Sequence, residues 1–373
     1  MGSNPPESVL RLSKNNVHIA GYVSDNKLIE YYQTSRLAVA PLRFGAGVKG
    51  KVIEAMYYGL PIVTTSIGAD ISTTGTQTYT GAVTLTGTAA TRTITTTADT
   101  ITFSSTVNAV DATDRDLTFG TGTGTVTFTG AVGTTNNLGT IINASGQQLT
   151  FSDAVTATTI ANYGTLLFNA TSDKTIAGNI TDNGTTTIGI IDSADGAPGI
   201  ITFSGNVAAD TITVGSSAKA GSALFNGAVS GTNISIIGGD GTSSAENSQA
   251  TFANTVTVTA ITLDNNTSSA TATFSGATKT ITGTINGAAA GEGTIVVSGT
   301  PTFASTIGNS FRPAQLTING ATTFQAAVQT AALTTTAAIS NGTTLNVSGN
   351  SSIGANVTTS STQTYTGAVT LTA

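Results

Sequence analysis

The sequence contains no cysteine, no tryptophan and a single histidine, His18. The absence of cysteine excludes disulfide bonds and thiolate chemistry, and it suits either a cytosolic or an exported bacterial protein. Residues 71–373 contain no histidine, and most of their acidic residues are scattered singly. We therefore expect no catalytic residues and no metal site in that region.

Charge is also scarce, because only 9% of the 373 residues are charged and the net charge is −6. Residues 71–373 carry six Lys or Arg and fourteen Asp or Glu, so no basic stripe is available for a phosphate backbone and nucleic acid is not an expected partner. No run of roughly 18 apolar residues is present, so no transmembrane helix is expected. Residues 1–6 lack a basic and apolar signal segment, so we expect no export signal in this chain.

The densest acidic cluster consists of Asp111, Asp114 and Asp116. Three carboxylates so close in sequence suit a calcium site, because Ca²⁺ prefers oxygen ligands. A solvated loop with no bound ion is the alternative interpretation of the same spacing.

Glycine and β-branched residues are abundant, with 43 glycines in the chain. This composition favours short strands joined by tight turns and disfavours helices. A disordered low-complexity chain is the alternative. The regular supply of Phe, Ile, Val and Leu argues against it, because disordered chains are poor in such residues.

A five-residue pattern recurs along most of the chain: an aromatic residue, a small polar residue, a turn-former, any residue, and Val or a substitute. Most copies follow one another at the short, fairly regular spacing that is typical of repeat proteins. Two longer gaps hold degenerate copies around Ile176 and Leu345. The aromatic residues of the eleven copies are Tyr79, Phe103, Phe128, Phe151, Phe203, Phe225, Phe252, Phe274, Phe303, Phe324 and Tyr365.

This repeat predicts an all-β fold, a parallel β-helix (β-solenoid) of about 12–13 coils over residues 76–373. The aromatic residue and the apolar residue two positions before it share a strand face, so both should point into the core. The residue two positions after the aromatic tolerates a left-handed or turn conformation, and we expect a corner there. Stacked about 4.8 Å apart, the coils would form a rod on the order of 60 Å long.

One segment, Thr-Gln-Thr-Tyr-Thr-Gly-Ala-Val-Thr-Leu-Thr, occurs unchanged at residues 76–86 and at residues 362–372. Twelve intervals of about 24 residues would span the distance between the two copies. Self-similarity at this period indicates a stack of repeats.

Residues 1–70 differ from the rest of the chain. Their pattern predicts a strand at 17–20, a helix that begins after Ser24 or Asp25, a strand at 37–40, a helix at about 49–58 and a strand at 61–65. Alternating strands and helices indicate a small α/β (Rossmann-like) segment with a parallel sheet. We expect residues 1–70 to form this segment, residues 71–75 to form a polar connector, and the solenoid to begin at residue 76.

Residues 41–69 resemble the donor-binding half of a group 1 GT-B glycosyltransferase; they read Pro-Leu-Arg-Phe-Gly-Ala-Gly-Val-Lys-Gly-Lys-Val-Ile-Glu-Ala-Met-Tyr-Tyr-Gly-Leu-Pro-Ile-Val-Thr-Thr-Ser-Ile-Gly-Ala. The resemblance implies a nucleotide-sugar donor bound at a glycine-rich loop and a helix N-terminus, where free N–H groups favour an anion. It assigns the loop to Gly45 and Gly47, phosphate neutralisation to Arg43, Lys49 and Lys51, and the ribose hydroxyls to Glu54.

Two departures from the family pattern weaken the enzymatic interpretation. Many relatives carry a second Glu eight positions before the first, where this chain has Ala46. The resemblance also begins in mid-domain, without the family's opening strands and acceptor domain. We therefore expect a truncated, inactive remnant.

The sequence Thr-Gln-Thr-Tyr-Thr-Gly-Ala-Val-Thr-Leu-Thr of the repeat region resembles the β-strand repeats of filamentous haemagglutinin and autotransporter passengers. The resemblance implies an adhesin-like stalk with host-surface or matrix ligands. It would be extracellular or at the cell surface if exported with a longer parent chain, and cytoplasmic otherwise.

Two functions therefore remain open. The first is a non-enzymatic bacterial surface or secreted β-solenoid that carries an inactive glycosyltransferase remnant, with no cofactor. The second is a glycosyltransferase with the solenoid as an appendage. The first is favoured, because an incomplete donor half cannot position an acceptor and positioning is a large part of catalysis.

Overall fold

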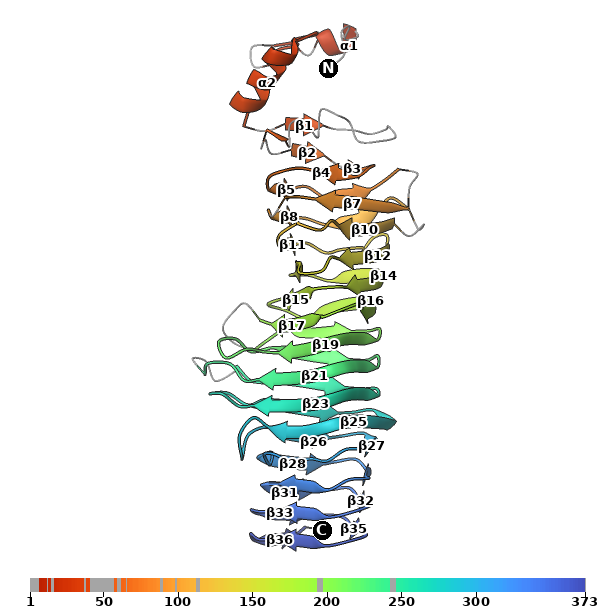
Figure 1. Cartoon of the computed structure of the whole chain (residues 1–373), viewed down its shortest axis with the longest axis vertical. Helices are drawn as coiled ribbons and strands as arrows, with labels where there is room; N and C mark the ends of the chain where they lie inside the picture. Colours follow the sequence, from red (N-terminus) through yellow and green to blue (C-terminus); the bar gives the residue numbers. More distant parts are fainter. Residues whose placement is uncertain are drawn as a thin grey trace.

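The structure is a computed structural model of the 373-residue chain. It describes residues 7–11, 13–14, 17–36, 38–40, 57–58, 62–64, 66–87, 90–97, 99–111, 115–192, 197–241 and 246–372. The described residues form an elongated β-solenoid, with helices α1 and α2 at its N-terminal end (Figure 1). Strands account for 52% of the residues and helices for 4%.

The N-terminal segment contains α1 (Glu7–Leu10), α2 (Asp25–Thr34), β1 (Ala38–Ala40) and β2 (Ile62–Thr64). Ser24 is the N-cap residue of α2, and Leu28 is the buried residue of that helix. Strands β1 and β2 pair in parallel, with Val39 opposite Val63. The predicted helix and parallel strand pair are therefore present. The predicted strand at 17–20 is absent. Val17 makes only an isolated bridge to Lys14 and is 42% exposed.

The solenoid consists of strands β3 to β37. The first coils contain β3 (Ser66–Ile67), β4 (Ile71–Ser72), β5 (Gln77–Tyr79), β6 (Val83–Leu85), β7 (Thr91–Thr95), β8 (Ile101–Phe103), β9 (Val107–Ala109), β10 (Arg115–Phe119) and β11 (Val126–Phe128). The central coils contain β12 (Leu138–Asn143), β13 (Gln148–Phe151), β14 (Val155–Asn162), β15 (Thr165–Asn169), β16 (Lys174–Asp182), β17 (Thr187–Ile191), β18 (Ile200–Phe203), β19 (Val207–Val214), β20 (Ser222–Phe225), β21 (Val229–Ile237), β22 (Ser248–Phe252), β23 (Val256–Asp264), β24 (Ala270–Phe274) and β25 (Ala277–Gly287).

The last coils contain β26 (Thr294–Val297), β27 (Thr300–Phe303), β28 (Gln315–Ile318), β29 (Thr322–Phe324), β30 (Val328–Thr330), β31 (Ala332–Thr335), β32 (Ile339–Asn341), β33 (Leu345–Val347), β34 (Ser351–Ile353), β35 (Val357–Thr359), β36 (Gln363–Tyr365) and β37 (Val369–Leu371). Each strand pairs in parallel with a strand of the neighbouring coil, and the solenoid has about 13 turns. The predicted parallel β-helix is confirmed.

An uninterrupted column of aliphatic side chains, here called the aliphatic column, shows how the coils stack. It runs between Gln77 and Gln363, and each member lies opposite the next in the strand register or in an isolated parallel bridge. Its members are Ile101, Val126, Leu149, Leu166, Ile188, Ile212, Ile234, Ile261, Ile285, Ile307, Val328 and Leu345, each at most 1% exposed.

Thirteen steps of register lead from Gln77 through the aliphatic column to Gln363, one more than the twelve intervals that were predicted. The predicted total of about 12–13 coils is confirmed by the about 13 turns, and the interval count differs by one because the last coils are short. The step from Leu345 to Gln363, for example, uses fewer residues than the step from Gln77 to Ile101. The two copies of the repeated segment occupy equivalent positions, because Gln77 and Gln363 lie at the two ends of the same register.

Ten of the eleven predicted aromatic residues are buried in the core, and Tyr365 in the last coil is partly buried. Phe168 and Phe119 are buried as well, although neither belongs to a copy of the five-residue pattern. The rings of Tyr79 to Phe324 follow one another at centroid distances of 4.7 to 5.6 Å. We call this series the aromatic stack.

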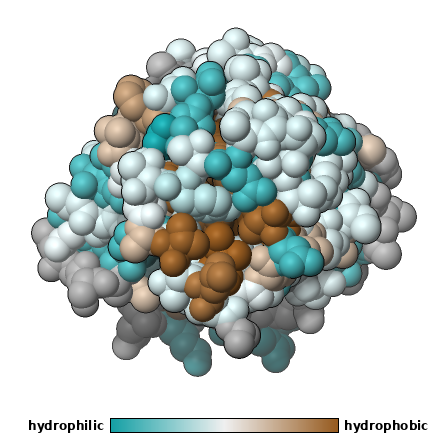
Figure 2. All heavy atoms as spheres, turned by 90° about the horizontal axis from the view of Figure 1, so that it is seen from below, coloured by the Kyte–Doolittle hydropathy of each residue, from teal (hydrophilic) through white to brown (hydrophobic). Residues whose placement is uncertain are grey.

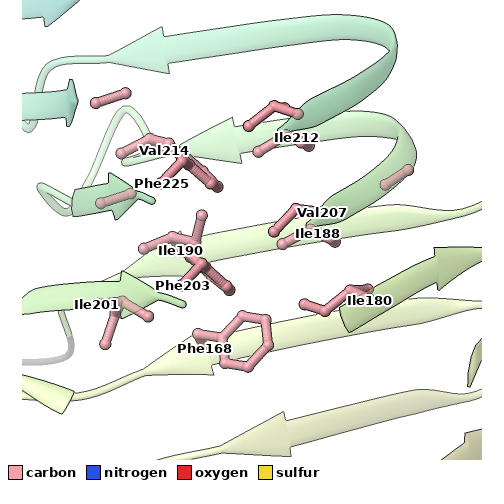
Figure 3. Packing of buried hydrophobic residues seen from close by; sticks show 14 of the residues in the cluster. Phe168, Ile180, Ile188, Ile190, Ile201, Phe203, Val207, Ile212, Val214 and Phe225 are labelled. Atoms are coloured by element: carbon pink, nitrogen blue, oxygen red, sulfur yellow. The ribbon is translucent and has the colours of Figure 1, made fainter. Parts of the chain in front are cut away.

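The aromatic stack changes position in the coil twice. Phe168 lies opposite Ile190 in the next coil, whereas Phe203 lies opposite Ile176. At this change the two rings meet at 85°, while Phe203 and Phe225 are nearly parallel at 6° (Figure 3). A second change, between Phe274 and Phe303, has an angle of 84°. The stack therefore stays continuous in space even where the sequence register changes.

The chain bends at nearly all of the corner positions two residues after the aromatics, as predicted, but the glycines there do not adopt a positive φ. Gly227 has no positive φ, so a left-handed conformation is not required there. A Cβ at this position would lie 2.1 Å from the carbonyl oxygen of Gly205 in the preceding coil. At Gly227 glycine is therefore required by the close approach of the corner in the preceding coil, whereas Gly81 has open space.

Strand pairing in the solenoid begins at β3, before residue 76. Ile67 lies opposite Leu85, and Ile71 lies opposite Ile94. The side chains of Ile67 and Ile71 are at most 3% exposed. Residues 66–72 therefore contribute apolar side chains to the first coil.

Candidate functional site

The residues implied to bind a nucleotide sugar cannot be placed, because they all lie outside the described residues: Arg43, Gly45, Gly47, Lys49, Lys51 and Glu54. The frame around them is described. β1 ends at Ala40, and the parallel strand β2 begins at Ile62. Ligands of open α/β sheets bind outside the carboxyl ends of the strands, and Ala40 marks the carboxyl end of β1.

Helix α2 packs near this frame through aromatic rings. The rings of Tyr32 and Tyr58 are stacked, with centroids 5.6 Å apart and planes 18° apart. Tyr57 meets Tyr58 edge-on at 5.2 Å and is 63% exposed. His18, the single histidine, is exposed on the surface. The ring contact places α2 beside Tyr58.

The acidic cluster of the sequence is used for contacts between and within coils. A carboxylate oxygen of Asp111 lies 3.5 Å from the guanidinium of Arg115. Asp116 accepts a hydrogen bond of 2.6 Å from the backbone N–H of Thr140 in the next coil. Asp114 lies outside the described residues. Among the described residues no group of three or more His, Cys, Asp or Glu could hold a metal ion.

Other polar side chains also tie one coil to the next. Asp173 accepts a hydrogen bond of 2.9 Å from the backbone N–H of Ile200. The Asn179 side chain accepts a hydrogen bond of 2.9 Å from the backbone N–H of Asn206. Side-chain oxygens at the corners therefore satisfy backbone donors that the strand ladders leave over.

An ion pair joins Lys174 to Asp153, with 2.9 Å between Nζ and a carboxylate oxygen. Partial burial alone would raise the pKa of Asp153, but the hydrogen bond from Lys174 helps to outweigh it, and the pKa lies below its ordinary value. This pair links β16 to the corner of the preceding coil. It therefore stabilises the stacking of the two coils.

Arg92 is a buried polar residue that sequence reasoning missed. It is 1% exposed, and its guanidinium donates hydrogen bonds to the carbonyl oxygens of Thr86 (2.7 Å from Nε) and Thr91 (2.6 Å). These bonds satisfy carbonyls at the edge of the first coils. No sequence signal marks this arginine, because its burial depends on contacts with carbonyls outside its own strand, such as that of Thr86.

The outer surface near the C-terminus carries a shallow groove across β29, β32 and β35. Its lining combines apolar side chains with hydroxyls and one amide, and consists of Ala321, Thr322, Thr323, Ala338, Ile339, Ser340, Asn356 and Thr358. None of these lining residues is charged.

The C-terminal end of the solenoid exposes apolar side chains. We define the end face as Gln363, Tyr365, Val369 and Leu371 of β36 and β37. Val369 is 45% exposed, Leu371 is 79% exposed, and Tyr365 is partly buried. Viewed from this end, hydrophobic residues gather at the centre of the molecule (Figure 2).

A family model described as glycosyl transferases group 1 matches residues 1–99. The searches of curated proteins and of solved structures give no match. The match supports the glycosyltransferase resemblance and extends it through β3 to β7 of the first coils. The resemblance to filamentous haemagglutinin and autotransporters is not confirmed by any family match. No helix of the described part is long and apolar enough to cross a membrane.

Proposed function

We propose that this chain is a non-enzymatic, adhesin-like β-solenoid, secreted or displayed on a bacterial cell surface, and that residues 1–70 are an inactive glycosyltransferase remnant. The aliphatic column carries the proposal. Twelve side chains, each at most 1% exposed, fill the interior over about 13 turns. A rod with a filled interior acts through its outer surface and its ends.

The surface chemistry supports a binding stalk. Thirteen turns at about 4.8 Å give a rod of about 60 Å, which holds its two ends well apart. The groove of the outer surface is lined by small residues, hydroxyls and an amide. Such a surface suits polar host-surface or matrix ligands. We infer that the chain is displayed extracellularly as part of a longer parent chain.

Surface display can be tested in the cells that produce the chain. An antibody against the solenoid is applied to intact cells and to permeabilised cells, with an antibody against a cytoplasmic protein as the control. We expect staining of intact cells. Staining that requires permeabilisation would overturn the surface location.

Adhesion needs a separate test. Beads coated with the full chain are compared with uncoated beads on immobilised matrix proteins and on host cells. Saturable binding that soluble chain competes away supports the adhesin role. Binding equal to that of uncoated beads would leave the rod without this function.

The second candidate, a glycosyltransferase, is favoured by the family match to residues 1–99. In this alternative Gly45 and Gly47 approach the diphosphate, Arg43, Lys49 and Lys51 neutralise it, and Glu54 holds the ribose.

The test of this alternative is release of nucleotide from UDP- and GDP-sugars by the full chain. The matched variants are Glu54→Ala and Glu7→Ala, since Glu7 is a solvent-exposed glutamate of the same segment. Release abolished only by Glu54→Ala would establish this candidate.

A further inference from the structure

Five asparagines of the solenoid are each followed directly by glycine. The pairs are Asn183–Gly184, Asn226–Gly227, Asn286–Gly287, Asn319–Gly320 and Asn341–Gly342. Asparagine before glycine is prone to deamidation, because glycine has no Cβ to obstruct its own amide nitrogen as that nitrogen approaches the asparagine side chain. A folded chain slows the reaction when it holds either group in a hydrogen bond. The hydrogen bonds therefore decide which of the five pairs reacts.

In four of the pairs both reacting groups are held by hydrogen bonds. Each asparagine side chain has a partner: Thr181 Oγ1 for Asn183 (2.9 Å), the N–H of Ser310 for Asn286 (3.0 Å), the hydroxyl of Thr336 for Asn319 (3.2 Å) and the N–H of Thr343 for Asn341 (2.8 Å). Each glycine N–H has an acceptor, in the same order a carboxylate oxygen of Asp182 (3.2 Å) and the carbonyl oxygens of Phe311 (3.1 Å), Val297 (3.2 Å) and Phe324 (2.7 Å).

The pair Asn226–Gly227, at the corner after β20, differs from the other four. Asn226 is exposed. Within the described part of the chain its side chain makes no hydrogen bond, and the N–H of Gly227 has no acceptor. Exposure alone does not set this pair apart, because Asn183 and Asn319 are also exposed. The difference is that both reacting groups are free.

The backbone of Asn226 is nevertheless fixed on both sides. Its N–H donates a hydrogen bond of 2.9 Å to the carbonyl oxygen of Phe203 in the preceding coil. Its carbonyl oxygen accepts a hydrogen bond of 3.2 Å from Nδ2 of Asn254 in the next coil. The corner therefore keeps its place in the stack while the asparagine side chain turns freely in solvent.

We propose that Asn226 is a site of spontaneous deamidation in the folded chain. The amide nitrogen of Gly227 bonds to Cγ of Asn226, and the side-chain nitrogen leaves as ammonia with the proton from the glycine nitrogen. Water then adds to one of the two carbonyls of the cyclic imide and breaks its bond to nitrogen, which gives aspartate or isoaspartate. Solvent water is the only co-reactant. This inference does not depend on the proposed stalk function.

Isoaspartate fits this corner poorly, because its main chain is one carbon longer than that of asparagine. A Cβ on Gly227 would already lie 2.1 Å from the carbonyl oxygen of Gly205 in the preceding coil. Phe225, directly before Asn226, is fully buried in the aromatic stack. We therefore expect isoaspartate to lower the unfolding temperature of the chain. Aspartate keeps the original main-chain length and should have a smaller effect.

The test is peptide mapping by mass spectrometry after the full chain is incubated at mildly alkaline pH in water labelled with oxygen-18. We expect Asn226 to take up the label at least about tenfold faster than each of the other four asparagines, because two hydrogen bonds must break before those react. In urea all five should be labelled at rates within about threefold of one another, because the unfolded chain holds none of these groups.

Two variants connect the reaction to stability. Asn226→Gln keeps an exposed amide but forms its larger cyclic imide far more slowly, so its unfolding temperature should stay constant during the same incubation. Asn226→Asp introduces the charge without the longer main chain. Its unfolding temperature should lie above that of incubated chain enriched in isoaspartate. Circular dichroism before incubation confirms that both variants are folded.

Three results would overturn the proposal. The first is no label at Asn226 in the folded chain while all five asparagines are labelled in urea, which would show that the corner prevents the reaction. The second is equal labelling of all five asparagines in the folded chain, which would show that the hydrogen bonds do not select the site. The third is an equal fall in unfolding temperature for Asn226→Gln, which would place the damage elsewhere.

Discussion

The aromatic stack makes Phe225→Ala the most informative core substitution. Phe225 is fully buried between Phe203 and Phe252, at centroid distances of 5.0 and 5.3 Å and with both ring pairs at 6°. Truncating a buried Phe to Ala costs about 3–5 kcal/mol through lost burial and the cavity left behind. Each stacked pair adds about 0.5–1.5 kcal/mol. We therefore expect a loss near the upper end, about 4–5 kcal/mol.

Phe311→Ala is the matched control, because Phe311 is a solenoid phenylalanine that is 47% exposed. Since only about half of its surface is buried, its truncation should cost about 1 kcal/mol. Urea unfolding followed by circular dichroism gives both free energies. Repeat proteins can unfold locally, so hydrogen exchange at β20 and its neighbours is measured in parallel. A cost for Phe225→Ala no larger than that for Phe311→Ala would refute a core built on this stack.

Three further outcomes are expected. Burial raises the pKa of Tyr79, so the stability that its neutral side chain contributes is full below about pH 10 and declines above that pH. Thermal unfolding measured from pH 8 to 11 should show this loss of stability. Tyr79→Phe, which has no ionisable hydroxyl, should show a smaller loss. The pKa of Asp153 is lowered, so the stability that its carboxylate contributes is present above about pH 4 and lost below that pH. Asp153→Asn should therefore flatten the dependence of the unfolding temperature on pH between pH 3 and 6. An unchanged pH dependence would contradict the ion pair. Gly133→Ala should lower the unfolding temperature far more than Gly81→Ala. Gly133 has φ +69° and a Cβ there would lie 1.9 Å from the carbonyl oxygen of Thr156, whereas a Cβ at Gly81 would meet open space. Equal effects of the two substitutions would contradict the close approach at Gly133.

The fold was predictable from the sequence because its signal is local. An apolar residue, an aromatic two positions later and a corner two positions after that define one strand and one turn, as at Ile201, Phe203 and Gly205. Eleven copies made the repeat visible. The parallel stacking then followed, because each such unit can bury its apolar face only against its neighbours.

The details that the sequence did not reveal depend on register between coils. Phe168 lacks the Val that marks the repeat, yet it stacks on Phe151 at 5.6 Å because residues 151–168 form one short coil. The change in position of the aromatic stack between Phe168 and Phe203 has no signal in the local sequence either. Tyr365 repeats Tyr79 in sequence and differs in that no described strand covers it.

The candidate sites also differ in how far the local sequence predicts them. The glycosyltransferase resemblance was recognisable from a contiguous motif, and the family match to residues 1–99 supports it. The roles of Arg43, Lys49 and Glu54 stay predictions, since these residues lie outside the described part of the chain. The end face could not be predicted from its sequence, because the identical residues are buried in the first coils.

The central claim is that the rod, and not a nucleotide-sugar site, carries the function of this chain. Isothermal titration calorimetry of the full chain with UDP- and GDP-sugars tests it most directly. The account predicts no saturable heat, because residues 1–70 are proposed to be a remnant of the donor half that no longer binds a nucleotide sugar. Micromolar binding that Glu54→Ala abolishes would contradict the account and favour the enzyme.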